Sequence, residues 1–111
     1  MKNKPSLNPS ELLTDFNRLY ILTQLHQGPQ YGYQLITQFR TNLQKNISPS
    51  AVYPFLKQLE TNGYLTHTTT LIGERQRKTC QLTPKGQDFC QTLFQLFTAI
   101  FAPAIKAAQP V

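Results

Sequence analysis

The sequence predicts a mainly α-helical protein that carries one small β-hairpin. Through most of its 111 residues, apolar side chains recur at intervals of three and four, which is the spacing of one face of a helix. That period is lost at residues 64–82, where threonines and other β-prone residues are frequent. It returns after Thr83-Pro84, a pair that suits the start of a helix. The predicted order is therefore three helices, two strands and one further helix.

A first helix is expected from about residue 10 to residue 27. Either Asn8 or Ser10 can cap its amino end, because both side chains carry an oxygen that accepts a backbone N–H. Its apolar stripe consists of Leu12, Phe16 and Leu19. Gly28-Pro29 ends it, since this dipeptide cannot continue a helix. The preceding residues 1–8 are expected to form a flexible N-terminal arm.

Two more helices are expected before Gly63. The second spans about residues 31–44, and its inward face consists of Leu35, Ile36, Phe39 and Leu43. The third begins at Ser48-Pro49, an N-cap followed by a proline in the first turn, where the missing N–H costs nothing. It runs to about Asn62, and Gly63 ends it because glycine readily adopts the left-handed conformation that follows many helices.

The hairpin is expected to pair residues 64–71 with residues 77–82 across a turn at Ile72-Gly73-Glu74. The last helix is expected from Pro84 to about Ala102, because Pro103 would interrupt its hydrogen bonds.

Three helices followed by a hairpin form the winged helix-turn-helix arrangement. In that arrangement the third helix enters a DNA groove and the hairpin is the wing beside it. Residues 9–86 are accordingly predicted to be a winged-helix DNA-binding domain. Residues 87–111 are predicted to be a C-terminal dimerisation helix and tail.

The third helix has two chemically different faces. Its apolar face consists of Val52, Phe55, Leu56 and Leu59. On the opposite face, Ser50, Tyr53 and Lys57 offer a hydroxyl, a phenol and an ammonium, which suit phosphate oxygens and base edges. The alternative is an ordinary amphipathic helix with a polar outer face. Its place between a helical turn and a basic hairpin favours the DNA interpretation.

Positive charge is concentrated in the hairpin. The chain has 11 Lys and Arg against 5 Asp and Glu, a formal net charge of +6, which favours an acidic partner such as nucleic acid. Arg75, Arg77 and Lys78 lie at or near the hairpin tip, where they can reach phosphates or enter a narrow minor groove. The alternative for this run is a solvated loop.

Four motifs, in order, resemble the PadR family of transcriptional regulators. They are Gly28-Pro29-x-Tyr31-Gly32-Tyr33-x-Leu35, Ser48-x-Ser50-x-Val52-Tyr53-Pro54-x-Leu56-Lys57-x-Leu59-Glu60-x-x-Gly63-Tyr64-Leu65, Gly73-x-Arg75-x-Arg77-Lys78 and Leu82-Thr83-x-x-Gly86. The resemblance covers about residues 19–90. The sequence departs from it at Thr79 and Cys80, where family members often have aromatic residues, and in having a single C-terminal helix where many members have a longer helical domain.

The resemblance implies a dimeric winged-helix repressor that uses the third helix and the wing on DNA. At matching positions the DNA-binding residues would be Ser48, Ser50, Tyr53, Lys57, Arg75, Arg77 and Lys78. Tyr31 and Tyr33 also match, but packing between the first two helices is an equally good explanation for them.

The last helix is too apolar to line only its own core. Its apolar residues cover about half of the helix circumference, and the excess is Phe94, Phe97 and Phe101. A partner helix in a two-fold homodimer would cover this face. The alternative is that the first helix of the same chain covers it.

Catalytic and metal-binding motifs are not recognisable. His26 and His67 stand without a cysteine or carboxylate at metal-ligand spacing, so no metal and no cofactor is expected. With no phosphate loop or nucleophile motif, the chain is not expected to be an enzyme. Neither a membrane span nor an export signal is recognised, so the chain is expected to be cytoplasmic. Cys80 and Cys90 are then expected to be reduced structural thiols; the alternative is that they form a redox pair.

The combined prediction is a sequence-specific DNA-binding repressor that binds an inverted-repeat operator as a homodimer. A small-molecule or protein effector is left open. The alternative is a winged-helix protein–protein interaction module that does not read DNA. Such a module would have a neutral third-helix face, and Lys57 together with the basic wing argues against it.

Overall fold

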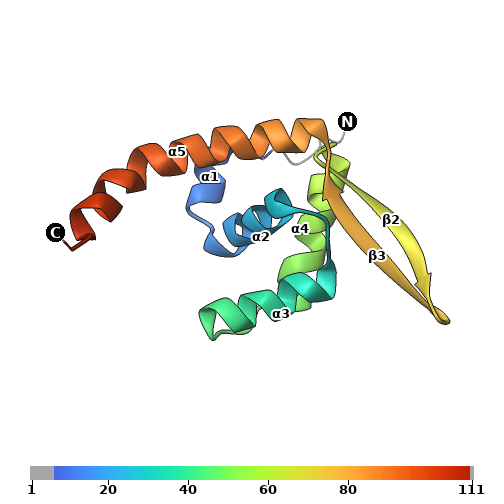
Figure 1. Cartoon of the computed structure of the whole chain (residues 1–111). Helices are drawn as coiled ribbons and strands as arrows, with labels where there is room; N and C mark the ends of the chain where they lie inside the picture. Colours follow the sequence, from blue (N-terminus) through green and yellow to red (C-terminus); the bar gives the residue numbers. More distant parts are fainter. Residues whose placement is uncertain (1–6, 111) are drawn as a thin grey trace.

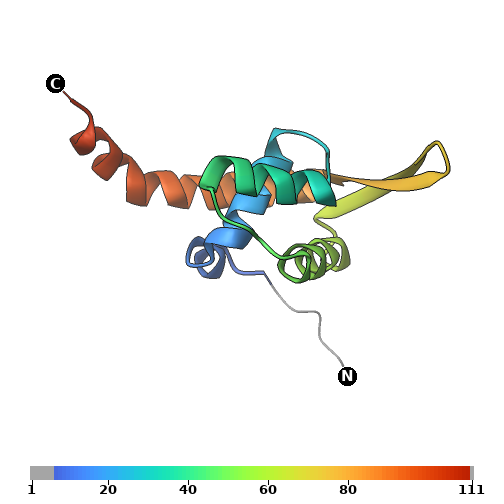
Figure 2. The same cartoon turned by 90° about the horizontal axis from the view of Figure 1, so that it is seen from below.

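Five helices and three strands make up residues 7–110, the part of the chain that the computed structural model describes. In chain order they are α1 (Pro9–Leu13), α2 (Phe16–Gln27), β1 (Gln30–Tyr31), α3 (Gly32–Leu43), α4 (Pro49–Thr61), β2 (Leu65–Ile72), β3 (Arg75–Leu82) and α5 (Pro84–Ala108). The β2–β3 hairpin projects away from the helices on one side, and α5 extends past them on the other (Figures 1 and 2). The predicted class, mainly helical with a small β-hairpin in a winged helix-turn-helix arrangement, is confirmed.

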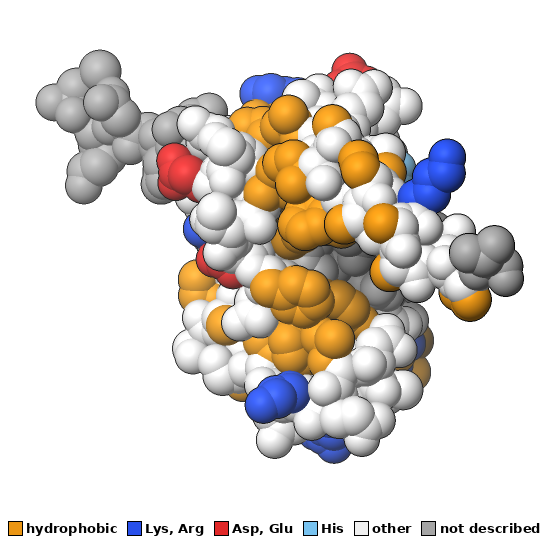
Figure 3. All heavy atoms as spheres, turned by 90° about the vertical axis from the view of Figure 1, so that its left-hand side faces the viewer, with side chains coloured by type: hydrophobic (Ala, Val, Ile, Leu, Met, Phe, Trp, Pro, Cys, Tyr) orange, Lys and Arg blue, Asp and Glu red, His pale blue; other side chains and the backbone are white. Residues whose placement is uncertain are grey.

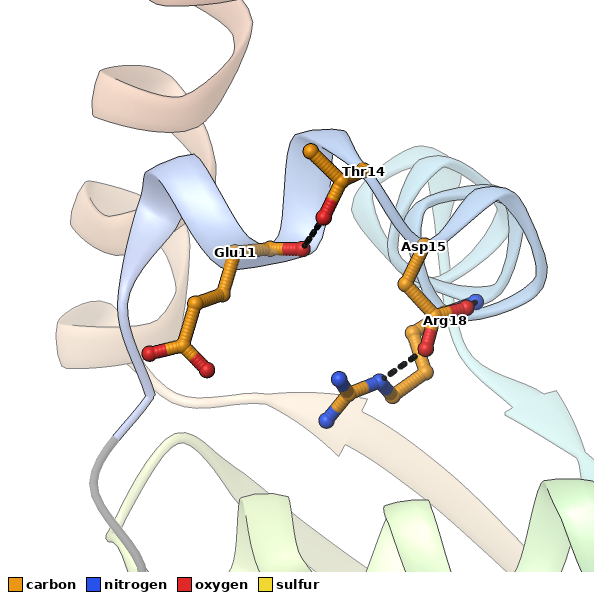
Figure 4. Close-up of polar contacts among 4 residues, drawn as sticks. All are labelled: Glu11, Thr14, Asp15 and Arg18. Atoms are coloured by element: carbon orange, nitrogen blue, oxygen red, sulfur yellow. Dashed lines mark hydrogen bonds and ion pairs between the residues drawn. The ribbon is translucent and has the colours of Figure 1, made fainter.

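The expected first helix is two helices, because the chain turns at Thr14 and Asp15 (Figure 4). The Thr14 hydroxyl donates to the Glu11 carbonyl at 2.8 Å, which helps to close α1. Asp15 then starts α2 by accepting from the Arg18 backbone N–H at 3.2 Å. The break removes Phe16 from the expected apolar stripe and leaves it 55% exposed.

The amino-terminal region before α1 was expected to be an arm. Residues 1–6 of it lie outside the described residues. Leu7 packs partly buried against the core, and Asn8 caps α1 by accepting from the Ser10 N–H at 3.0 Å. Of the two expected caps, Asn8 is the one used.

The hairpin belongs to a three-stranded antiparallel sheet with the order β1-β3-β2. The short strand β1 was not expected; it pairs Gln30 with Cys80 and Tyr31 with Thr79. The turn is shorter than expected, because β2 includes Ile72 and β3 already begins at Arg75. Gly73 in this turn has a φ of 66°, a left-handed conformation that glycine adopts without strain.

The core lies between α1, α2, α3, α4, the base of the wing and the first half of α5. All four residues of the predicted apolar face of α4 are buried there, and so are Leu12, Leu19, Leu22, Leu25, Leu35, Phe39, Leu65, Leu82, Cys90 and Leu93. The opposite face of α4 is therefore the outward one, as expected.

A fixed joint attaches α5 to this core. The Thr83 hydroxyl accepts from the Gly86 N–H at 3.0 Å and donates to the Gly63 carbonyl at 2.7 Å. A Cβ on Gly86 would collide with the Tyr64 backbone carbonyl, so the helix approaches the chain here as closely as glycine permits. Lys85 donates to the Asn62 carbonyl at 3.0 Å, so its charge belongs to this joint and not to the wing.

The last helix does not end before Pro103 but continues to Ala108. Proline in a helix leaves the carbonyl four residues earlier without its usual donor. That carbonyl belongs to Ala99, and both Ala99 and Pro103 are exposed, so water can hydrate it. The break expected at Pro103 was wrong for this reason.

Candidate nucleic-acid interface

The outward face of α4 presents hydroxyl, phenol and ammonium groups to solvent. Ser50, Tyr53 and Lys57 are all exposed, at spacings of three and four along the helix. Ser48 lies at the N-cap position, and its hydroxyl is 2.9 Å from that of Ser50. The four residues singled out in the sequence, three in α4 and one at its N-cap, therefore lie on one exposed surface.

The start of α3 lies against this surface. Gly32 is so close to the Tyr53 ring that a Cβ on it would overlap the ring atoms. Tyr33, one residue on, is 65% exposed, so it does not pack between the first two helices. Tyr31 is half-buried and contacts the wing, as described below.

The three basic residues of the wing do not share one face. Pairing in the hairpin places Ile72 opposite Arg75, Thr70 opposite Arg77 and Thr69 opposite Lys78. Because side chains alternate along a strand, Arg75 and Arg77 point to one side of the ribbon and Lys78 to the other. Lys78 shares its side with Cys80 and His67, which faces α4.

An open groove of about 700 Å³ runs between the wing, α4 and the start of α3. Its lining combines aromatic and basic side chains, among them Tyr31, Tyr33, Tyr53, Lys57, Arg75, Arg77 and Lys78. Of the seven residues predicted to bind DNA, five therefore line one groove, and Ser48 and Ser50 lie at the start of the same helix. Cations beside aromatic rings suit a polyanion that carries flat bases.

Two side-chain contacts in this groove were missed in the sequence. The Arg77 guanidinium carbon lies 4.1 Å from the centroid of the Tyr31 ring. On the other side of the ribbon, the His67 ring nitrogen Nδ1 contacts the Glu60 carboxylate of α4. His67 was expected to be isolated, and no local signal reveals its partner, because the pair forms only when β2 folds back beside α4.

The apolar face of α5 divides into a covered and an uncovered part. Phe94 and Phe97 pack partly buried against the core of their own chain. The centroid of the Phe94 ring lies 5.2 Å from that of the His26 ring. Four other apolar residues of the helix are between 40% and 57% exposed, namely Leu96, Ile100, Phe101 and Ile105. Figure 3 views the molecule from the side toward which the C-terminal end of α5 points, and apolar side chains fill the middle of that face.

By length and composition alone, α5 is also apolar enough to cross a membrane. Its first half, however, supplies Cys90 and Leu93 to the core of the winged domain, where both are fully buried. Insertion into a bilayer would remove these side chains from that core.

Both cysteines are buried and free. Burial raises the pKa of the Cys90 thiol to about 11. Burial also raises the pKa of Cys80, and the nearby Glu60 carboxylate adds to this effect while Lys78 opposes it. Neither thiol is therefore activated as a thiolate at neutral pH. Within residues 7–110, no group of three or more His, Cys, Asp and Glu side chains is arranged to hold a metal ion.

A three-helix domain with a β-wing, whose outward helix and wing enclose a basic groove, defines the winged helix-turn-helix class of proteins. Within that class the chain belongs to the PadR-like family of transcriptional regulators, whose family model matches residues 21–92.

Solved structures resemble the whole fold. A transcriptional regulator from Clostridium thermocellum is 22% identical with a TM-score of 0.69, over 93% of this chain and 100% of the other. A PadR-like transcription factor from Bacteroides fragilis is 21% identical with a TM-score of 0.73, over 89% and 96% of the two chains. PadR of Bacillus subtilis, solved in complex with operator DNA, is 28% identical with a TM-score of 0.66, over 78% of this chain and 48% of that one. No curated protein sequence matches significantly.

Proposed function

We propose that this chain is a sequence-specific DNA-binding repressor that works in the cytoplasm and binds an inverted-repeat operator as a homodimer. The observation that carries the proposal is the groove in which the outward face of α4 and the basic wing meet. The structure of Bacillus subtilis PadR with operator DNA supports the proposal, since the chain shares the fold of that regulator.

In this proposal the residues have two different tasks. Tyr53 and Lys57 of α4 reach base edges in the major groove, while Ser48 and Ser50 bind phosphates at the start of the helix. The wing residues Arg75, Arg77 and Lys78 bind the backbone or the minor groove, and they supply affinity more than sequence reading.

The homodimer follows from the uncovered part of α5. The side of this helix that is buried at Gly86, Cys90 and Leu93 continues through the half-buried Phe97 to Phe101 and Ile105. The rest of the chain leaves Phe101 and Ile105 exposed. A second copy would bury this surface against its equivalent. Residues 9–86 then serve as the DNA-binding part and residues 87–111 as the dimerisation part.

Selection of bound duplexes from a random DNA pool tests the proposal. The selected site should be an inverted repeat with half-sites one helical turn, about 34 Å, apart. Recovery of no preferred sequence would contradict sequence-specific binding.

The two faces of α4 provide matched variants for this test. Tyr53→Ala should leave folding intact, because the side chain is 47% exposed, and should weaken operator binding by about 1–3 kcal/mol. Leu59→Ala should instead cost about 2–5 kcal/mol of folding stability, because Leu59 is fully buried. If Tyr53→Ala and Lys57→Ala both bind the selected operator as tightly as the parent, the assigned face is not used.

A further inference from the structure

Apolar packing does not hold the outer wing. Leu65, Cys80 and Leu82 anchor its base in the core, but every residue from 66 to 78 is exposed. The short strand β1 pairs with β3 only at Thr79 and Cys80, which also lie at the base. The angle between the wing and α4 therefore depends on the few side chains that connect the wing to the helical part of the protein.

The first such connection joins Arg77 to Tyr31. The guanidinium carbon lies 4.1 Å from the ring centroid, which is the geometry of a cation–π contact. Tyr31 lies at the junction of β1 and α3, and its backbone N–H donates to the Gln34 side-chain oxygen at 3.3 Å. The backbone of Tyr31 is therefore fixed to the start of α3, and its half-buried ring lies under the Arg77 guanidinium.

The second connection joins His67 of β2 to Glu60 in the last turn of α4. It lies on the opposite side of the ribbon from Arg77. His67 pairs with Cys80 and so shares its side, whereas Arg77 is three positions from Cys80 along β3 and therefore points the other way. One contact thus holds each side of the wing, and together they limit its movement toward or away from α4.

We infer that Tyr31 and Glu60 are positioning residues that fix the angle between the wing and the reading helix before DNA binds. The inference rests on the proposed function. A wing fixed in advance loses less conformational freedom on binding, so affinity rises without a further DNA contact. Tyr31 on this account acts through Arg77 rather than on the DNA.

Two Tyr31 variants test the ring contact. Tyr31→Leu removes the aromatic face, and Tyr31→Phe keeps it as the matched control. Amide order parameters from ¹⁵N relaxation should fall for residues 66–78 in the Leu variant and stay unchanged in the Phe variant. Affinity for the selected operator should fall about two- to five-fold in the Leu variant only. The salt dependence of binding should not change, because no phosphate contact is lost.

The Glu60 contact has its own control and keeps the test decisive if Tyr31→Leu does not fold. Glu60→Ala should lower the wing order parameters, whereas Glu74→Ala, which removes an acid from the exposed wing tip, should not. Affinity is not the measure here, because loss of an acid beside DNA strengthens binding by itself.

Unchanged wing order parameters in both Tyr31→Leu and Glu60→Ala would overturn the inference. A loss in Tyr31→Phe as large as in Tyr31→Leu would also overturn it, because the hydroxyl and not the ring would then be responsible. Failure of the proposed function gives a different result, namely a parent protein that selects no DNA sequence.

Discussion

Asp15 lies between α1 and α2, and its carboxylate caps the amino end of α2. Burial opposes its ionisation, yet hydrogen bonds from the Arg18 side chain and backbone outweigh burial and lower the pKa of Asp15 below its ordinary value. The Arg18 Nε lies 2.7 Å from the carboxylate, while its guanidinium carbon is 5.6 Å from the Phe55 ring centroid. One residue therefore caps α2 and positions a contact to α4.

This arrangement predicts a pH-dependent loss of stability. Asp15→Ala should lower the free energy of unfolding at pH 7 by about 0.5–2 kcal/mol, because the N-cap is lost. The folded-state pKa is the lower one, so the contribution of the ionised carboxylate is fully present above the ordinary pKa of about 3.9 and disappears as pH falls through the folded-state pKa.

Denaturant melts of parent and variant across pH 2–7 measure the difference. Asp15→Asn is the control, because asparagine caps equally well but does not titrate. A parent-to-Ala difference that remains the same at the acid end would contradict the assigned role of the charge.

Among the elements, α5 depends on one glycine for its position. A methyl group on Gly86 would meet the Tyr64 backbone carbonyl, which cannot rotate away as a side chain could. Although alanine is the better helix former, Gly86→Ala should lower the free energy of unfolding by about 1–3 kcal/mol. Thermal unfolding checks this, with the exposed Ala104→Gly as the control for helix propensity alone. A Gly86→Ala protein as stable as the parent would show that the joint can relax.

The wing is the element in which charge should matter most. Arg75→Ala should weaken binding to operator and random DNA alike. If one phosphate contact is lost, the negative slope of log K against log salt should become shallower by about 0.9. Titrations at several salt concentrations measure this slope. Lys106→Ala near the end of α5 is the control, since it removes the same charge far from the groove along α5. An unchanged slope in Arg75→Ala would mean that this side chain does not reach DNA.

At the scale of the whole molecule, the uncovered part of α5 predicts a dimer at micromolar concentration. Ile100→Glu with Phe101→Glu should produce a folded monomer, because both side chains are exposed in the single chain and a charge buried in the interface is strongly unfavourable. Sedimentation equilibrium measures the mass, and circular dichroism checks the fold. Gln95→Glu adds a charge on the polar side of α5 and should leave the dimer intact. A monomeric parent would disprove the proposed dimer.

The sequence by itself determined α3, α4, the hairpin and the start of α5, together with the two faces of α4; it did not reveal β1 or the break between α1 and α2. These properties follow from contacts within a few residues: apolar spacing, the Thr83 cap and the Gly63 terminator are all local, so the printed order of residues carries them. It also determined the family resemblance and five of the residues that line the groove.

Only the tertiary structure decided how those pieces meet. Tyr31 and Arg77 are 46 positions apart and are in contact because β1 joins the sheet. His67 contacts Glu60 because β2 folds back beside α4. The division of α5 into covered and uncovered parts has the same origin, since Phe94 and Phe101 are the same residue type, yet Phe94 packs against His26 of α2 and Phe101 is exposed. Contacts between distant segments depend on the packed geometry of the whole chain, and apolar period and capping patterns contain no record of that geometry.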